Sequence, residues 1–111
     1  MTGPVKMLVV FLNEVDRIGE EPLYEVVMRR LRKREVAGAT ALHGVMGFGQ
    51  HHRMHHKGLF GIADDRPITI TVVDSEARVR SLLPELRSLV PTAPMLIVDA
   101  ELVPPSQTTA V

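Results

Sequence analysis

The chain has 111 residues, of which 45% are hydrophobic, and its 13 basic and 13 acidic side chains give a formal net charge of zero. This length predicts one domain with a small core, for which association between copies would add stability. A balanced charge argues against general nucleic-acid binding, which depends on excess positive charge to release counterions. Because the chain has no cysteine, disulfides, zinc–thiolate sites and thiol catalysis are excluded.

The N-terminal residues lack the charged and apolar regions of a signal peptide, and no apolar run approaches the ~18 residues of a membrane span. The sequence therefore predicts a cytoplasmic protein. We expect a single domain over residues 1–104, followed by a flexible polar tail over residues 105–111.

The first third of the chain predicts a strand, a loop and a helix. Residues 5–13 are apolar almost throughout, which is typical of a strand covered on both faces. Residues 14–21 are expected to form a loop. Pro22 suits the first helical position because its missing N–H would be unpaired there. The helix is expected to run to about residue 36, with Gly38 as its stop signal.

The next segments predict two strands separated by a long connection. Residues 39–48 are expected to form the second strand, weakened by Gly44 and Gly47, and residues 50–66 a polar connection. Residues 67–74 alternate between two faces, as a third strand would.

The last third predicts a helix and a fourth strand. Asp74 and Ser75 supply an N-cap for the helix, and Pro84 is expected to kink it or to end its first segment. Residues 95–103 read as the fourth strand. The predicted buried stripes are Leu23, Val27 and Leu31 on the first helix, and Val79, Leu82, Leu83, Leu86, Leu89 and Val90 on the second.

This order of elements predicts an α+β fold, the ferredoxin-like βαββαβ sandwich, with an antiparallel four-stranded sheet and two helices on one face. The other face would stay open in a single copy. Because the first strand is apolar on both faces, that open face predicts a homo-oligomer.

The most informative stretch lies between the second and third strands. Gly44, Gly47 and Gly49 are followed by four of the five histidines. Glycine lets the backbone approach a ligand closely, and successive backbone N–H groups can bind an anion. The same glycines are equally consistent with a bend where the chain leaves the sheet.

Four segments together resemble a PII-like family of small bacterial proteins of unassigned function, relatives of the PII nitrogen-signalling proteins. The first two are Pro22-Leu23-Tyr24-Glu25 and Ala37-Gly38-Ala39-Thr40. The third is Gly44-Val45-Met46-Gly47-Phe48-Gly49 with Arg53 and His55. The fourth is Asp65-Arg66-Pro67 leading to Val73-Asp74-Ser75.

The resemblance implies a homotrimer of ferredoxin-like subunits that binds a small anionic effector, an adenine nucleotide, in the clefts between subunits. The effector-binding residues that it implies are Gly47, Phe48, Gly49, Arg53 and His55. The loop after the second strand would report binding to a regulated partner, either a membrane transporter or an enzyme.

The chain departs from the PII proteins at two places. Histidines replace the Arg-Gln pair that follows Gly-Phe-Gly in PII, and residues 89–94 contain neither the glycines nor the lysine of the PII phosphate loop. A monophosphate is therefore easier to accommodate than a triphosphate.

A metal-binding or metal-sensing trimer is the alternative function. On a helix, His51 with His55 and His52 with His56 would each share a face and could hold zinc, nickel or copper. Asp64 or Asp65 could add a ligand. The competing interpretation is a solvated loop, and a purely structural interaction module without a ligand remains a third possibility.

Two further patterns have structural explanations. Five cations between Arg29 and Arg34 could form a docking patch, but are better explained as a solvated helix face favoured by the helix dipole. Asp74 is explained by helix capping. We find no nucleophile–base pair, no phosphate-binding Walker loop and no paired carboxylates, so the protein is not expected to be an enzyme and no cofactor is certain.

Overall fold

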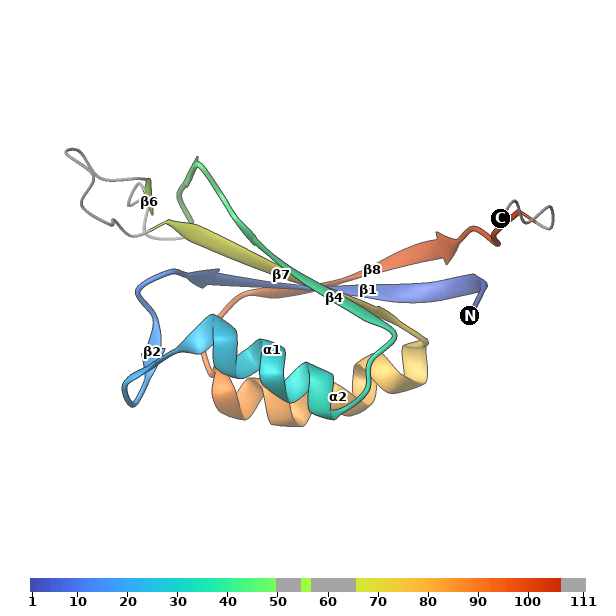
Figure 1. Cartoon of the computed structure of the whole chain (residues 1–111), viewed down its shortest axis with the longest axis horizontal. Helices are drawn as coiled ribbons and strands as arrows, with labels where there is room; N and C mark the ends of the chain where they lie inside the picture. Colours follow the sequence, from blue (N-terminus) through green and yellow to red (C-terminus); the bar gives the residue numbers. More distant parts are fainter. Residues whose placement is uncertain (50–54, 57–65, 107–111) are drawn as a thin grey trace.

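The computed structural model of the chain describes residues 1–49, 55–56 and 66–106. The elements in chain order are β1 (Gly3–Asn13), β2 (Arg17–Ile18), β3 (Glu21–Pro22), α1 (Leu23–Lys33), β4 (Gly38–His43), β5 (Met46–Gly47), β6 (His55–His56), β7 (Pro67–Asp74), α2 (Glu76–Leu89) and β8 (Met95–Leu102). Figure 1 shows them from the side, with both helices on the same side of the main sheet.

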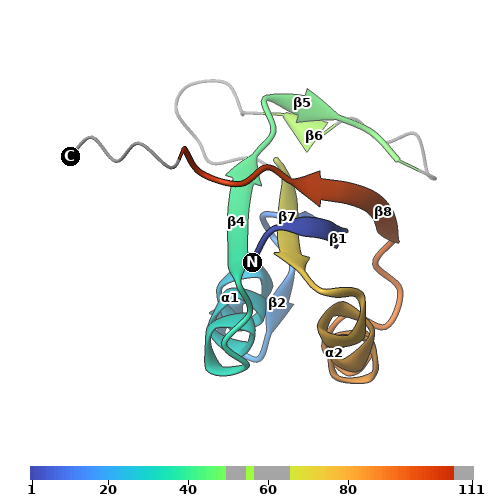
Figure 2. The same ribbon diagram turned by 90° about the vertical axis from the view of Figure 1, so that its right-hand side faces the viewer.

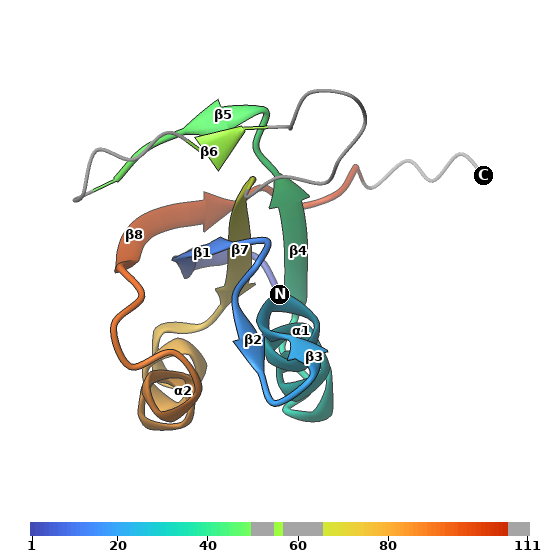
Figure 3. The same ribbon diagram turned by 90° about the vertical axis from the view of Figure 1, so that its left-hand side faces the viewer.

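The main sheet has four strands in the order β4-β7-β1-β8, and every neighbouring pair is antiparallel. Both helices pack under one face of this sheet, as the two end-on views show (Figures 2 and 3). The predicted α+β fold, a ferredoxin-like βαββαβ sandwich, is therefore confirmed. The expected single domain over residues 1–104 stays a prediction, and most of the expected tail lies outside the described residues.

The core lies between the sheet and the helices, and it follows from strand alternation. Leu8 and Val10 of β1 pair in register with Val72 and Ile70 of β7, so their side chains share the helix-facing side. The side chains predicted to be buried on the helices form the other half of the core, except that Leu83 and Leu89 are only partly buried at its edge. Its buried members are Leu8, Val10, Leu12, Leu23, Val27, Leu31, Ile68, Ile70, Val72, Val79, Leu82, Leu86 and Val90.

The opposite face of the sheet is also apolar. The alternate residues of β1 turn toward it; Val5 and Val9 are buried there by neighbouring strands, whereas Phe11 is exposed. Leu42 of β4 and Leu96 of β8 belong to the same face and are 59% and 52% exposed. We call this surface the open face: Met7, Val9 and Phe11 of β1, Thr40 and Leu42 of β4, Thr69, Thr71 and Val73 of β7, and Leu96 and Val98 of β8.

The ends of α1 differ from the prediction by one to three residues. Pro22 is the N-cap, not the first helical residue, and the first helical N–H, that of Leu23, donates to the Asp16 carbonyl at 2.8 Å. The helix ends at Lys33. Glu35, with a φ of 56°, has the left-handed backbone conformation that follows the helix, so the helix stops before Gly38, the expected stop signal. Gly38 instead opens β4.

The segment predicted as a loop before α1 contains a small hairpin. Arg17 of β2 pairs with Pro22 of β3. The Asp16 carboxylate accepts a hydrogen bond from the Asn13 backbone N–H at 2.9 Å, which orders the turn that leads into the hairpin.

The second helix continues through Pro84, so the expectation that Pro84 would end a first helical segment is wrong. Proline removes one backbone donor, the one that would reach the Arg80 carbonyl. Leu82 and Leu86, on either side of Pro84, are both buried in the core. Their packing holds both halves of the helix on the sheet and compensates for the missing hydrogen bond.

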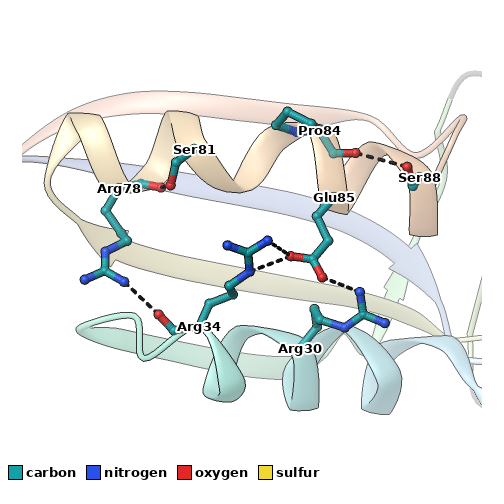
Figure 4. A network of polar contacts seen from close by, with 7 residues as sticks. All are labelled: Arg30, Arg34, Arg78, Ser81, Pro84, Glu85 and Ser88. Atoms are coloured by element: carbon teal, nitrogen blue, oxygen red, sulfur yellow. Dashed lines mark hydrogen bonds and ion pairs between the residues drawn. The ribbon is translucent and has the colours of Figure 1, made fainter.

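The two helices are tied to each other by charged side chains (Figure 4). Glu85 of α2 lies between Arg30 and Arg34 at the end of α1, and Arg34 binds it at 2.7 Å. The Arg78 side chain donates to the Arg34 carbonyl at 2.7 Å. Arg29 pairs with Glu21. The basic run therefore forms mainly intramolecular contacts on the solvated helix face.

Asp74 is the one buried charged residue of the described part of the chain. Its carboxylate accepts a hydrogen bond from the Ser75 N–H at 2.7 Å and another from the Ala37 N–H at 2.9 Å. Ser75, not Asp74, is the N-cap of α2, and its hydroxyl accepts from the Arg78 N–H. Asp74 thus joins the end of β7 and the start of α2 to the connection between α1 and β4.

Neither of the two helices is both long and apolar enough to cross a membrane, a finding that covers the described residues.

Replacing Asp74 with alanine should lower the free energy of unfolding by about 3 kcal/mol. It removes two charge-assisted hydrogen bonds to the buried carboxylate and leaves the N–H groups of Ala37 and Ser75 without that acceptor. The measurement is urea unfolding followed by circular dichroism. Asp99→Ala is the matched control, because Asp99 is an exposed partner of Lys6 and exposed pairs contribute little. Equal losses for the two variants would contradict the assigned role.

Candidate functional site

The candidate site is built on a short two-stranded arm that follows β4. The arm comprises residues 45–49 and 55–56; its strands β5 and β6 pair Met46 with His56 and Gly47 with His55. It lies on the side of the sheet opposite the helices (Figures 2 and 3). The predicted single strand over residues 39–48 is therefore two strands, β4 and β5, separated by a break at Gly44.

The break at Gly44 is held by Pro67, the first residue of β7. The Gly44 N–H donates to the Pro67 carbonyl at 2.7 Å. A Cβ added at Gly44 would lie 2.7 Å from Pro67 Cγ, and one at Gly47 would lie 3.3 Å from the same atom. A Cβ added at Gly49 would meet no atom of the described residues within 4 Å. The bend interpretation thus accounts for Gly44 and Gly47, and leaves Gly49 without a packing requirement.

The arm exposes large apolar side chains. Val45 is 83% exposed, and Met46 and Phe48 are also exposed. The arm itself lies on the same side of the main sheet as the open face (Figures 2 and 3). Exposed apolar surface of this extent is typical of an interaction site.

A charged cluster that the sequence did not reveal lies at the base of the arm. Glu14 follows β1, Arg66 precedes β7 and His43 ends β4. Arg66 Nε donates to Glu14 Oε2 at 3.0 Å, and His43 Nε2 lies 3.4 Å from Glu14 Oε1. The Tyr24 ring packs edge-on against the His43 ring, with centroids 6.0 Å apart. Three strand ends are thereby joined at one carboxylate.

The electrostatics of this cluster favour the ionised carboxylate. The hydrogen bond and charge of Arg66, opposed in part by burial and assisted by His43, lower the pKa of Glu14 from its ordinary value of 4.5. The backbone supports the contact, since the Glu14 N–H donates to the Arg66 carbonyl at 2.8 Å. No sequence motif links these residues, because they meet only when β1 and β7 pair.

The residues predicted to bind the effector are only partly placed. Gly47 lies in β5, and Phe48 and Gly49 follow it on the arm. His55 lies in β6. Arg53 lies outside the described residues, so the structure does not test whether the five come together.

The metal interpretation relied on helical spacing between histidines, which the structure tests only at His55 and His56. His55 and His56 lie in the strand β6 rather than on a helix, so the one-turn helical spacing to His51 and His52 does not apply to them. His51, His52, Asp64 and Asp65 lie outside the described residues. Elsewhere in the described chain, no group of three acidic or histidine side chains is placed to hold a metal ion. Metal binding stays a prediction.

The turn between α2 and β8 contains no basic residue, but the Arg87 side chain of α2 places a positive charge beside it. Arg87 reaches over this turn from α2, and its Nη1 donates to the carbonyls of Val90, Pro91 and Ala93 at 3.1, 3.2 and 2.8 Å. The Pro94 carbonyl accepts from the Phe11 N–H at 3.0 Å, which anchors the turn to β1. The turn therefore has a fixed backbone and a positive charge beside it.

The four-stranded antiparallel sheet with two helices on one face defines a ferredoxin-like fold. The chain belongs to the family described as DUF190, uncharacterized ACR, COG1993, which matches residues 5–102.

Two relatives have names that state no activity. A UPF0166 protein of Aquifex aeolicus is 24% identical over 82 residues, which is 74% of this chain and 78% of that protein. The UPF0166 protein MJ1524 of Methanocaldococcus jannaschii is 27% identical over 93 residues, 84% of this chain and 85% of that one.

Solved structures show the same fold. CPII of Thiomonas intermedia K12, a nitrogen regulatory PII-like protein bound to ADP, AMP and bicarbonate, matches with a TM-score of 0.66 and 23% identity, over 89% of this chain and 88% of that chain. A second structure of CPII, bound to ADP, AMP and acetate, matches with a TM-score of 0.65 and 20% identity, over 95% and 94% of the two chains.

Substituting Gly44 with alanine should lower the free energy of unfolding by about 2 kcal/mol, because the new methyl group overlaps the Pro67 ring. Chemical denaturation measures the loss. Gly49→Ala is the control, since its added methyl group meets no atom of the described residues, and we expect a change within about 0.5 kcal/mol. If Gly44→Ala is as stable as Gly49→Ala, Pro67 does not constrain the bend.

The stability of the protein should depend on pH through Glu14. Because the folded pKa of Glu14 lies below its unfolded value, its stabilisation is complete above pH ~4.5 and is lost as the pH falls through the folded pKa. Glu14→Gln should therefore lose more stability at pH 7 than at pH 3, measured as urea midpoints at both values. Glu20→Gln, at an exposed hairpin position, is the control. An equal loss from Glu14→Gln at both pH values would contradict the ion pair.

Proposed function

We propose that this protein is a non-catalytic, PII-like regulatory protein that forms a homotrimer and binds a small anionic effector, an adenine nucleotide, in the clefts between its subunits. Binding would change the conformation of the arm and of the segment that follows it. The arm would in turn control a partner protein, either a membrane transporter or an enzyme.

The observation that carries the proposal is the exposed apolar side chains on both the open face and the arm. Leu42, Leu96 and Phe11 lie exposed on one sheet face, and Val45 and Met46 are exposed on the arm. A single copy leaves this surface in water, at a cost of ~25 cal/mol for each Å² of apolar area. Packing against other copies would remove it and would create clefts beside the arm.

The fold likeness to CPII supports the choice of ligand. In those structures CPII binds ADP, AMP and bicarbonate or acetate, so a PII-like fold of this size can hold nucleotides and small anions. In this chain, Gly47 and Gly49 would allow close approach to a phosphate. Arg53 and His55 would supply donors and positive charge.

The composition of the turn between α2 and β8 favours an effector with few phosphate groups. It holds no glycine between residues 89 and 94, and its cation is the single guanidinium of Arg87, partly engaged by the turn's own carbonyls. One such cation suits a monophosphate or diphosphate better than a triphosphate.

Regulation would require the effector to bind one arm conformation better than another. A shift from mostly one state to mostly the other needs several kcal/mol of differential binding. The cluster of Glu14, Arg66 and His43 fixes the base of the arm, so the movement would be confined to the residues beyond that base.

Native mass spectrometry should detect a trimer that retains adenine nucleotide, and calorimetry should show saturable binding of AMP or ADP. Arg53→Ala should weaken binding about tenfold or more, since it removes a charge-assisted hydrogen bond to the phosphate. Arg32→Ala, which removes an exposed cation from α1, should leave the affinity unchanged.

A stable single copy at micromolar concentration would contradict the intersubunit site. A trimer that binds no member of a panel of adenine nucleotides, by heat or by thermal shift, would contradict the effector while leaving the assembly intact. The two failures are therefore distinguishable.

A further inference from the structure

A groove on the helix side of the molecule shares only Arg87 with the site described above. It runs between α2 and the edge strand β8, which lie on the same side of the molecule (Figure 3), and has a volume of about 600 Å³. This is within the range of small-molecule sites, ~300–1,000 Å³. Its apolar lining consists of Leu8, Leu83, Pro84, Met95 and Ile97.

The floor of the groove is formed by paired strands of the main sheet, so its position is fixed. Leu8 is fully buried, and Met95 and Ile97 pair in register with Val10 and Leu8 across the sheet. Pro84 lacks a backbone N–H, so the wall contributed by α2 offers no donor at that position. An occupant would therefore meet a preformed and mainly hydrophobic surface.

Within the described part of the chain, the charged residues of the lining are two arginines, Arg80 and Arg87, and none is acidic. The two lie seven residues apart on α2, which is ~10 Å along a helix, so they flank the apolar floor. Arg80 pairs with the exposed Glu76. The partners of Arg87 are neutral carbonyls, so its charge is not cancelled.

Arg87 retains a pair of donors for a ligand. All of its contacts within the described residues use Nη1, which leaves the edge formed by Nε and Nη2. That edge has the geometry of bidentate carboxylate recognition. The three carbonyl contacts also fix the guanidinium in place, so little side-chain freedom would be lost on binding.

We propose that the groove between α2 and β8 is a second binding site, and that it takes a free amphipathic carboxylate, an apolar chain with one terminal carboxyl group. The chain lies on Leu83, Met95 and Ile97, and the carboxylate binds Arg87 with Arg80 nearby. Because Arg87 also donates hydrogen bonds to the α2–β8 turn, a ligand bound in the groove alters the conformation of that turn. The site shares Arg87 with the nucleotide-binding function proposed above, but its apolar floor and its test are separate from that function.

The test is titration of the full chain with decanoate, followed by NMR of the methyl groups. Saturable shifts should appear at Leu83, Met95 and Ile97, and affinity should rise up to fourfold for each CH₂ added from octanoate to decanoate, about the effect of burying one CH₂. Decanol and decyltrimethylammonium should bind at least tenfold more weakly, since they lack the carboxylate.

Two pairs of variants locate the site. Arg87→Gln should weaken decanoate binding about tenfold, whereas Arg32→Gln, with the same change of net charge on α1, should not. Leu83→Phe should block binding by filling the groove, whereas Val98→Phe on the open face should not. The Leu83 and Val98 pair keeps the test valid if loss of Arg87 unfolds the turn.

Three results would overturn the proposal. The first is equal affinity for decanoate and decanol, which would mean simple hydrophobic adsorption. The second is a set of methyl shifts confined to the open face. The third is unchanged binding in Leu83→Phe. None of these measurements involves a nucleotide, so their outcome is separate from that of the proposed effector.

Discussion

The constraint on which this structure depends is that its sheet is apolar on both faces while the chain provides helices for only one. Leu8 and Val10 of β1 are covered by α1 and α2, and their neighbours Val9 and Phe11 turn the other way. A strand of this composition is usually covered on both sides. The open face is therefore the ground for the proposed association, and the arm lies on the same side of the main sheet.

The junctions between elements are fixed by a few polar and steric contacts. Asp74 joins the end of β7 to the connection after α1 through two backbone N–H groups. Pro67, at the other end of β7, contacts the break at Gly44. Glu14 binds both Arg66 and His43 at the base of the arm. These contacts lie at opposite ends of one strand, so β7 positions both the helix layer and the candidate site.

Where the sequence-based expectations failed, tertiary contacts had outweighed local preference. Gly38 is the better residue for a left-handed turn, yet Glu35 adopts that conformation, because the chain must turn after Lys33 to bring the Ala37 N–H to Asp74. Pro84 ordinarily breaks a helix, yet α2 continues because Leu82 and Leu86 are packed on the sheet. The histidines spaced for a helix include a pair in β6, since that segment pairs with β5.

The sequence by itself determined the order of strands and helices, the buried stripes and the apolar character of both sheet faces, because these follow from residue periodicity and side-chain hydrophobicity over short segments. Only the tertiary structure decided which distant residues meet. The Glu14, Arg66 and His43 cluster and the groove beside β8 depend on strand register and helix packing. Local sequence does not encode those contacts, because each unites side chains from segments whose relative positions are fixed only when the whole core closes.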